Sequence, residues 1–145
     1  MDDNGSIYML TVQNHILAPR RNEFAYINVT GQDSWEEAMS INTFNGNIYL
    51  LNTNKNQIQR HKPGINGFSQ ASSLLDKDQP GIFDISIDGG VYLYMDDSRI
   101  QRYTGNREIL TPIILNKIPG EWKIDTTQNS VFITRTNLSY TYILN

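Results

Sequence analysis

One short pattern, repeated along the chain, decides its fold: Gly89-Gly90-Val91-Tyr92-Leu93-Tyr94. A glycine leads into a β-branched aliphatic residue, an aromatic residue and a further apolar residue. The same pattern occurs in three other segments: Gly5-Ser6-Ile7-Tyr8-Met9-Leu10, Gly46-Asn47-Ile48-Tyr49-Leu50-Leu51 and Asn129-Ser130-Val131-Phe132-Ile133-Thr134. The aromatic residue recurs at intervals of 41, 43 and 40 residues, at Tyr8, Tyr49, Tyr92 and Phe132. Self-similarity at a fixed period predicts a repeat architecture.

A second landmark supports the same period. Ile58-Gln59-Arg60-His61 and Ile100-Gln101-Arg102-Tyr103 match each other 42 residues apart. Short β-branched or aromatic runs bounded by Gly, Asn, Asp or Pro read as strands. In the best-preserved unit they predict strands at 82–87, 90–95, 99–103 and 108–115. The preceding unit predicts strands at 38–43, 47–52, 57–61 and 68–74, and the last unit at 121–126, 131–135 and 138–144.

Four short strands in a period near 41 residues are typical of a β-propeller blade. Each blade packs both faces against neighbours, so its central strands should be apolar on both sides, as Ile48–Leu51 and Val91–Tyr94 are. The recurring aromatic residues are expected to pack between blades. The glycines Gly5, Gly46 and Gly89 suit the positive φ of the hairpin before the second strand. We therefore predict one all-β, propeller-like domain over residues 1–145, with repeat units at about 1–33, 34–78, 79–118 and 119–145.

The blades resemble those of the NHL and gluconolactonase-like propeller group. Two segments carry the resemblance: Phe83-Asp84-Ile85-Ser86-Ile87-Asp88-Gly89-Gly90-Val91-Tyr92-Leu93, and the run from Gly46 to Arg60. In that group a hydrophobic strand is followed by Asp-x-x-Gly, an aliphatic-Tyr strand, a polar turn and an Ile with a basic or aromatic residue. The motifs are architectural and are shared by proteins with unrelated activities.

The 145 residues hold only about three and a half units, whereas closed propellers usually carry 4–8 blades. The first unit is expected to lack its inner strand and the last its outer one. The segment 138–145 would then be an apolar edge, which natural proteins usually cover. We expect a protein partner, a second copy of the chain or further sequence of a longer propeller to cover it.

Composition excludes several classes of function. The net charge is −3 and the calculated pI is about 5.2, which argue against a broad nucleic-acid or anionic-lipid surface. The chain has no cysteine, so disulfides, zinc–thiolate sites and thiol nucleophiles are absent. The start Met1-Asp2-Asp3-Asn4-Gly5 lacks the basic and apolar regions of a signal peptide, and no apolar run is long enough to cross a membrane. No cofactor is expected, and the compartment is left open.

Few residues suggest chemistry. His15 and His61 lie in what we expect to be equivalent third-strand regions, at the surface or an edge, in no metal-binding motif. Asp84 is the strongest carboxylate candidate, because first strands line a propeller's channel. The resemblance implies that carboxylates there could hold Ca²⁺. Against this, Asp88 and Asp125 are expected at hairpin turns, and Ala38 is taken as the equivalent of Asp84 in the preceding unit.

Trp35 and Trp122 precede first strands, and we expect them to cap the core between blades, with sugar stacking as the alternative. The leading functional hypothesis is a non-enzymatic scaffold for protein–protein interaction, using loops such as Lys55-Asn56 and 62–66. Two alternatives stay open: a Ca²⁺-dependent hydrolase of the lactonase type, and a carbohydrate-binding propeller.

Overall fold

The computed structural model describes residues 6–32, 35, 38–52, 56–104, 109–115, 123–127, 130–135 and 138–143. The described residues contain strands and turns but no α-helix, so none of them forms a helix that could cross a membrane. The chain forms two compact units, Met1–Asp78 and Gln79–Asn145. Each unit contains two sheets.

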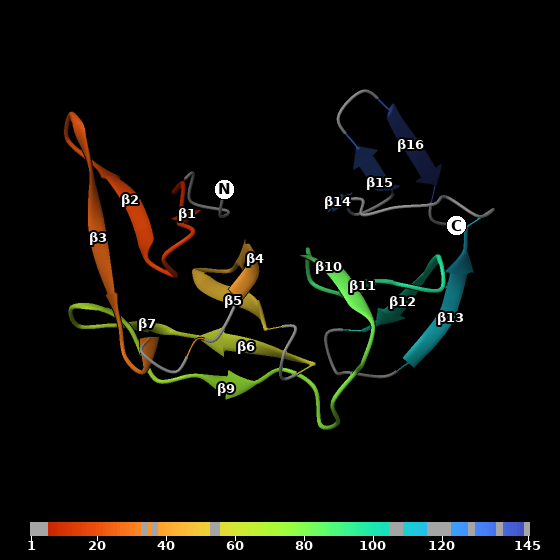
Figure 1. Cartoon of the computed structure of the whole chain (residues 1–145), viewed down its shortest axis with the longest axis horizontal. Helices are drawn as coiled ribbons and strands as arrows, with labels where there is room; N and C mark the ends of the chain where they lie inside the picture. Colours follow the sequence, from red (N-terminus) through yellow and green to blue (C-terminus); the bar gives the residue numbers. More distant parts are fainter. Residues whose placement is uncertain are drawn as a thin grey trace. The chain divides into compact units, whose positions relative to one another are not determined.

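The first unit contains a five-stranded and a four-stranded sheet (Figure 1). The first sheet has the order β1-β2-β3-β8-β7, and the second has the order β4-β5-β6-β9. Their strands are β1 (Met9–Leu10), β2 (Ile16–Arg20), β3 (Glu23–Val29), β4 (Ala38–Phe44), β5 (Asn47–Asn52), β6 (Gln57–His61), β7 (Pro63–Gly64), β8 (Gly67–Phe68) and β9 (Ser72–Ser73). Neighbouring strands are antiparallel except β3 and β8, which are parallel.

The second unit contains the third and fourth sheets, of four and three strands, with consecutive strands side by side. Their strands are β10 (Ile82–Ile87), β11 (Val91–Met95), β12 (Arg99–Tyr103), β13 (Ile109–Ile114), β14 (Lys123–Thr127), β15 (Ser130–Arg135) and β16 (Leu138–Ile143). All pairs are antiparallel. The meander predicted from sequence is confirmed in this unit, although residues 108, 121–122 and 144, at the ends of three predicted strands, lie outside the described residues.

Strand register shows the repeat in space. The second and third strands pair Leu10 with Ile16, Leu51 with Ile58 and Tyr94 with Ile100 in successive sheets, and the fourth sheet pairs Thr134 with Ser139. Counting back two residues from the first partner in each pair gives Tyr8, Tyr49, Tyr92 and Phe132. Tyr49, Tyr92 and Phe132 thus hold one position in their sheets, and Tyr8, which directly precedes β1, is the matching residue of the first sheet. A bulge also recurs, between Ala38 and Ser40 and between Ile82 and Asp84.

Each sheet therefore has two distinct faces, because side chains alternate along a strand. We call the face that carries the repeated aromatic residue the aromatic face. The opposite one, which we call the aliphatic face, carries the residues on either side of it, for example Ile48 and Leu50. In the first unit, Tyr8, Leu10 and Ile16 share a buried cluster with Ile41, Ile48 and Leu50. In the second unit, Tyr92, Tyr94 and Ile100 share one with Ile124, Val131 and Ile133. Within each unit, the aromatic face of one sheet packs on the aliphatic face of the next.

The hairpin before the second strand follows from local sequence in the second sheet. Asn45 and Gly46 have φ of +48° and +73°. A two-residue turn with both φ values positive matches the right-handed twist of the strands it joins, and Asn-Gly is its preferred sequence. Gly89 has φ of +109° at the matching place in the third sheet. Gly5 lies outside the described residues.

Three sequence expectations are wrong in detail. The segment 68–74 is not one strand, because Phe68 belongs to β8 and pairs with Val29 of the first sheet, which leaves only Ser72–Ser73 as β9. The register makes Ser40, not Ala38, the equivalent of Asp84, since the bulge inserts a residue before each. Asp125 lies inside β14 opposite Phe132 and not at a turn.

Candidate functional site

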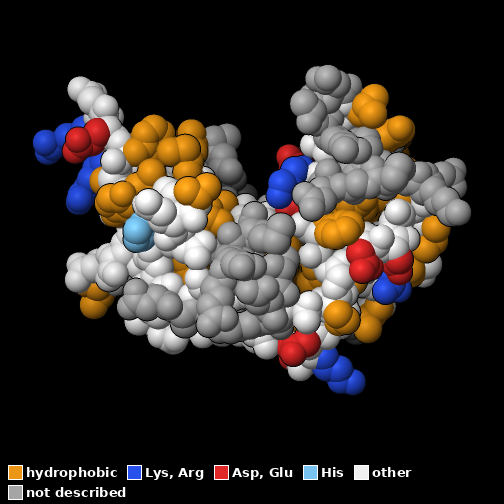
Figure 2. Space-filling model, viewed as in Figure 1, with side chains coloured by type: hydrophobic (Ala, Val, Ile, Leu, Met, Phe, Trp, Pro, Cys, Tyr) orange, Lys and Arg blue, Asp and Glu red, His pale blue; other side chains and the backbone are white. Residues whose placement is uncertain are grey.

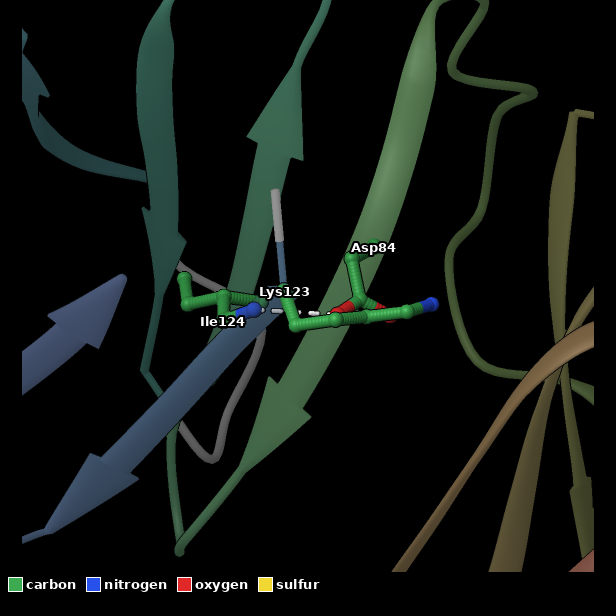
Figure 3. A network of polar contacts seen from close by, with 3 residues as sticks. All are labelled: Asp84, Lys123 and Ile124. Carbon is green, nitrogen blue, oxygen red and sulfur yellow. Dashed lines mark hydrogen bonds and ion pairs between the residues drawn. The ribbon is translucent and has the colours of Figure 1, made fainter. Parts of the chain in front are cut away.

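The strongest sequence candidate, Asp84, forms a polar contact between two first strands of the second unit (Figure 3). Its carboxylate is 2% exposed. One oxygen, Oδ2, accepts the backbone N–H of Ile124 at 2.9 Å, and Oδ1 lies 3.6 Å from Nζ of Lys123. Two residues along β10, the Ser86 hydroxyl is 2.7 Å from the Thr126 hydroxyl. Asp84 thus satisfies a backbone donor at the edge of the fourth sheet.

The other carboxylates named from sequence make local contacts. Asp88 Oδ1 accepts the Gly90 N–H at 3.4 Å, at the hairpin between β10 and β11. Asp125 is exposed, and its Oδ1 accepts the Thr126 N–H at 2.9 Å. Among the described residues, no three His, Asp or Glu side chains gather in a way that could hold a metal ion.

His61 is buried, contrary to the surface position expected for it. It ends β6, and its Nδ1 lies 2.7 Å from the carbonyl oxygen of Ser69, so the neutral ring donates there. Its ring meets that of Trp35 edge-on, with centroids 5.3 Å apart. Burial lowers the pKa of His61 from its ordinary value, and the hydrogen bond to Ser69 only partly offsets this. The described residues offer no partner for Nε2.

His15 is not the counterpart of His61, because it lies before β2 and stacks edge-on against Tyr26 at 5.1 Å. The register makes Pro19 the residue equivalent to His61 in the first sheet.

Trp35 is 4% exposed and belongs to the core cluster of the first unit. Its carbonyl oxygen accepts a hydrogen bond from the Asn14 side-chain amide at 2.7 Å. Because the faces of its indole are packed inside the unit, they are not free to stack on a sugar. Trp122 and Lys55 lie outside the described residues.

A groove of about 630 Å³ runs along the first unit. Its lining is mostly apolar: Ile7, Tyr8, Pro19, Ile27, Pro63 and Phe68. Tyr8 is the one titratable side chain among the residues that line it, so the groove brings together no acid–base pair. It suits an apolar contact better than a chemical step.

The feature that sequence reasoning missed is an uncovered aliphatic face on the first sheet. Ile7 and Met9 are 46% and 38% exposed, whereas their equivalents in the other three sheets are at most 6% exposed. Those equivalents are Ile48 and Leu50, Val91 and Leu93, and Val131 and Ile133. The register adds Leu17 and Tyr26 to the same face. In Figure 2, apolar side chains gather over the part of the molecule where Figure 1 places β1–β3.

The fourth sheet has an uncovered aromatic face. Lys123, Asp125, Thr134 and Thr141 are exposed on it and surround the half-buried Phe132, and Ile143 adds an apolar side chain that is also exposed. The equivalent positions in the third sheet, such as Asp84, Ser86 and Tyr94, are buried. The signal in the sequence was the repeat itself, because alignment of the units shows which positions of the four sheets are equivalent.

Comparisons with known proteins place the fold. No protein-family model matches the sequence, and no curated protein matches it. Among solved structures, the chain is similar to the computationally designed protein Ika4, with a TM-score of 0.56 and 11% identity over 97% of this chain and 86% of that one.

Two natural enzymes are also similar, and both are β-propellers. A catalytically inactive virginiamycin B lyase from Staphylococcus aureus, solved with quinupristin, has a TM-score of 0.53 and 14% identity over 99% of this chain and 53% of that one. Luciferin-regenerating enzyme has a TM-score of 0.52 and 14% identity over 88% of this chain and 43% of that one. The chain thus spans about half the length of these enzymes. At such identities the likeness shows the fold alone: an open, all-β, propeller-like series of four sheets.

Proposed function

We propose that the chain is a non-enzymatic β-propeller module that binds a protein partner through the aliphatic face of its first sheet. The observation that carries this proposal is the exposure of Ile7 and Met9 at positions that are buried in every other sheet. Contiguous exposed apolar surface with polar surroundings is typical of protein-binding sites. Tyr26, 68% exposed on the same face, adds an aromatic side chain of the kind enriched in such interfaces.

The chemistry of the described residues supports a binding role over a catalytic one. The buried carboxylate of Asp84 holds a backbone N–H and faces a lysine, so its oxygens serve the contact between β10 and β14. The groove of the first unit has no paired acid and base. A Ca²⁺-dependent hydrolase of the lactonase type and a carbohydrate-binding propeller therefore remain second to the protein-binding proposal.

A loop predicted to take part in recognition adds a second contact. Residues 62–66 include β7 and the turn to β8, and Ile65 at this turn is 101% exposed. An exposed isoleucine at a hairpin tip offers an apolar contact, and surface loops commonly carry binding residues. We include this hairpin in the proposed binding surface.

Photocrosslinking from the first sheet tests the proposal. A photoreactive phenylalanine analogue placed at Tyr26 is expected to give a discrete protein adduct in the cells that make this protein. The matched control is Ile114, which is 69% exposed on β13 and not on the proposed face. Adducts from Tyr26, absent from the Ile114 position and lost on Met9→Lys, support the proposal. Equal adducts from both positions, or none from either, contradict it.

A further inference from the structure

The two uncovered faces are of the two kinds that pack on each other inside each unit. The first sheet leaves its aliphatic face uncovered, and the fourth sheet leaves its aromatic face uncovered. Within each unit, the chain buries one aromatic face against one aliphatic face: Tyr8 and Ile48 belong to the first cluster, and Tyr92 and Val131 belong to the second. The chain therefore contains both halves of a contact that it makes twice internally.

From this we propose that a second copy of the chain covers the aliphatic face of the first sheet with the aromatic face of its own fourth sheet. The inference rests on the proposed function and names its partner. By equivalence with the contact inside the second unit, Phe132 of one copy takes the place of Tyr92 and packs against Ile7 and Met9 of the other. Each copy carries both faces, so a pair of copies offers this contact twice.

Length supports two copies in particular. The chain aligns over nearly its whole length with about half of the virginiamycin B lyase chain, so two copies supply the length of one such propeller. A head-to-tail contact between identical chains either closes into a ring or continues as a filament. Two chains of four sheets give eight, within the usual range of about 4–8 blades for closed propellers.

The side chains at the proposed contact favour this arrangement over a symmetric pairing of two first sheets. Two aliphatic faces pressed together would set Met9 and Leu17 against the same residues of the partner and leave both aromatic faces in water. The aromatic face of the fourth sheet instead has Phe132 at its centre and Ile143 at one end. Thr134 and Thr141 lie beside Phe132 on the same face. An apolar centre with a polar surround is the usual composition of a protein interface.

Sedimentation velocity of the purified chain tests the inference. The expected species has twice the 16.6 kDa mass of one chain. Met9→Lys and Phe132→Lys should each give one chain mass, and Thr141→Lys should do the same from an exposed position where folding is not at risk. Ile114→Lys is the matched control and should stay at two chain masses. Circular dichroism checks that each variant is folded.

Mixing two variants gives the sharpest result. A Met9→Lys chain keeps an intact aromatic face, and a Thr141→Lys chain keeps an intact aliphatic face, so an equimolar mixture should regain dimers through one unaltered contact. A folded chain that is a monomer at every concentration overturns the inference, and so does a dimer that resists Phe132→Lys and Thr141→Lys. If a monomeric chain still crosslinks from Tyr26 to a different protein, the inference fails while the proposed function stands; if it crosslinks to nothing, both fail.

Discussion

Removal of the Asp84 carboxylate should loosen the contact between the third and fourth sheets. This side chain is buried at 2% exposure and accepts the Ile124 N–H at 2.9 Å, while Lys123 reaches its other oxygen from a largely exposed position. Asp84→Ala would leave the Ile124 N–H in the interior without an acceptor. A buried donor deprived of its partner costs about 1–3 kcal/mol.

The size of the effect can be divided between the hydrogen bond and the ion pair. Hydrogen bonds to charged groups contribute about 1.5–3 kcal/mol, whereas ion pairs with an exposed partner contribute about 0–1 kcal/mol. We therefore expect Asp84→Ala to lower the free energy of unfolding by about 2–3 kcal/mol. Asp84→Asn keeps an oxygen that can accept the Ile124 N–H and should cost about 1 kcal/mol. Lys123→Met should cost less than either.

Urea unfolding followed by circular dichroism measures these differences, and hydrogen exchange at the Ile124 amide reports the bond itself. Exchange at Ile124 should speed up in Asp84→Ala and change little in Lys123→Met. Costs of less than about 0.5 kcal/mol for both Asp84 variants would place them with ordinary surface substitutions, and would refute the role given to this carboxylate.

Three further results are expected. Burial lowers the pKa of His61 below its ordinary 6.5, so below about pH 6.5 the unfolded chain binds a proton that the folded chain does not. The free energy of unfolding should therefore fall as the pH drops below about 6.5. Urea titrations between about pH 5 and 8 measure this slope, which His61→Gln should flatten. Gly67→Ala should break the β3–β8 pairing, because Gly67 has φ of +142° and an added Cβ would overlap the Asn28 carbonyl oxygen. Gly64→Ala is the control in the same hairpin, since an added Cβ there meets no atom closer than 3.7 Å. Hydrogen exchange at the Thr30 amide, which donates to the Phe68 carbonyl oxygen, should speed up only in Gly67→Ala. Millimolar Ca²⁺ should leave the melting temperature unchanged, since a ligand that binds only the folded state must raise it, and a rise would favour the hydrolase alternative.

The repeat allowed the all-β fold and most strands to be predicted from the sequence. Strands with a strong apolar pattern and clear turns, such as Ile82–Ile87 and Asn47–Asn52, were placed correctly because their signals are local. The segment 68–74 failed because Phe68 is equally apolar in either of two sheets. Phe68 pairs with Val29, and its ring centroid lies 5.6 Å from that of Tyr8. Both contacts join residues far apart in the sequence, so the local pattern could not predict them.

The candidate site was predicted only in part. His61 lies between Arg60 and Lys62, which suggests a surface position, but Trp35 and the Ser69 carbonyl cover it from elsewhere in the chain. Asp84 was predicted as a candidate, but its partner Ile124 was not. The 40 residues between them match the repeat period, which could have indicated a contact between successive repeats.

The proposed dimer covers the aliphatic face of the first sheet with a second copy of the chain. Oxidation of Met9 by hydrogen peroxide tests it directly, because this side chain is 38% exposed in the single chain while Met95 is 3% exposed and serves as an internal reference. Met9 should oxidise quickly in dilute solution and in Thr141→Lys, and slowly in concentrated wild-type protein, with Met95 slow throughout. This dependence on concentration is the result expected of the dimer. A Met9 rate that is the same at every concentration, and in both proteins, would contradict it.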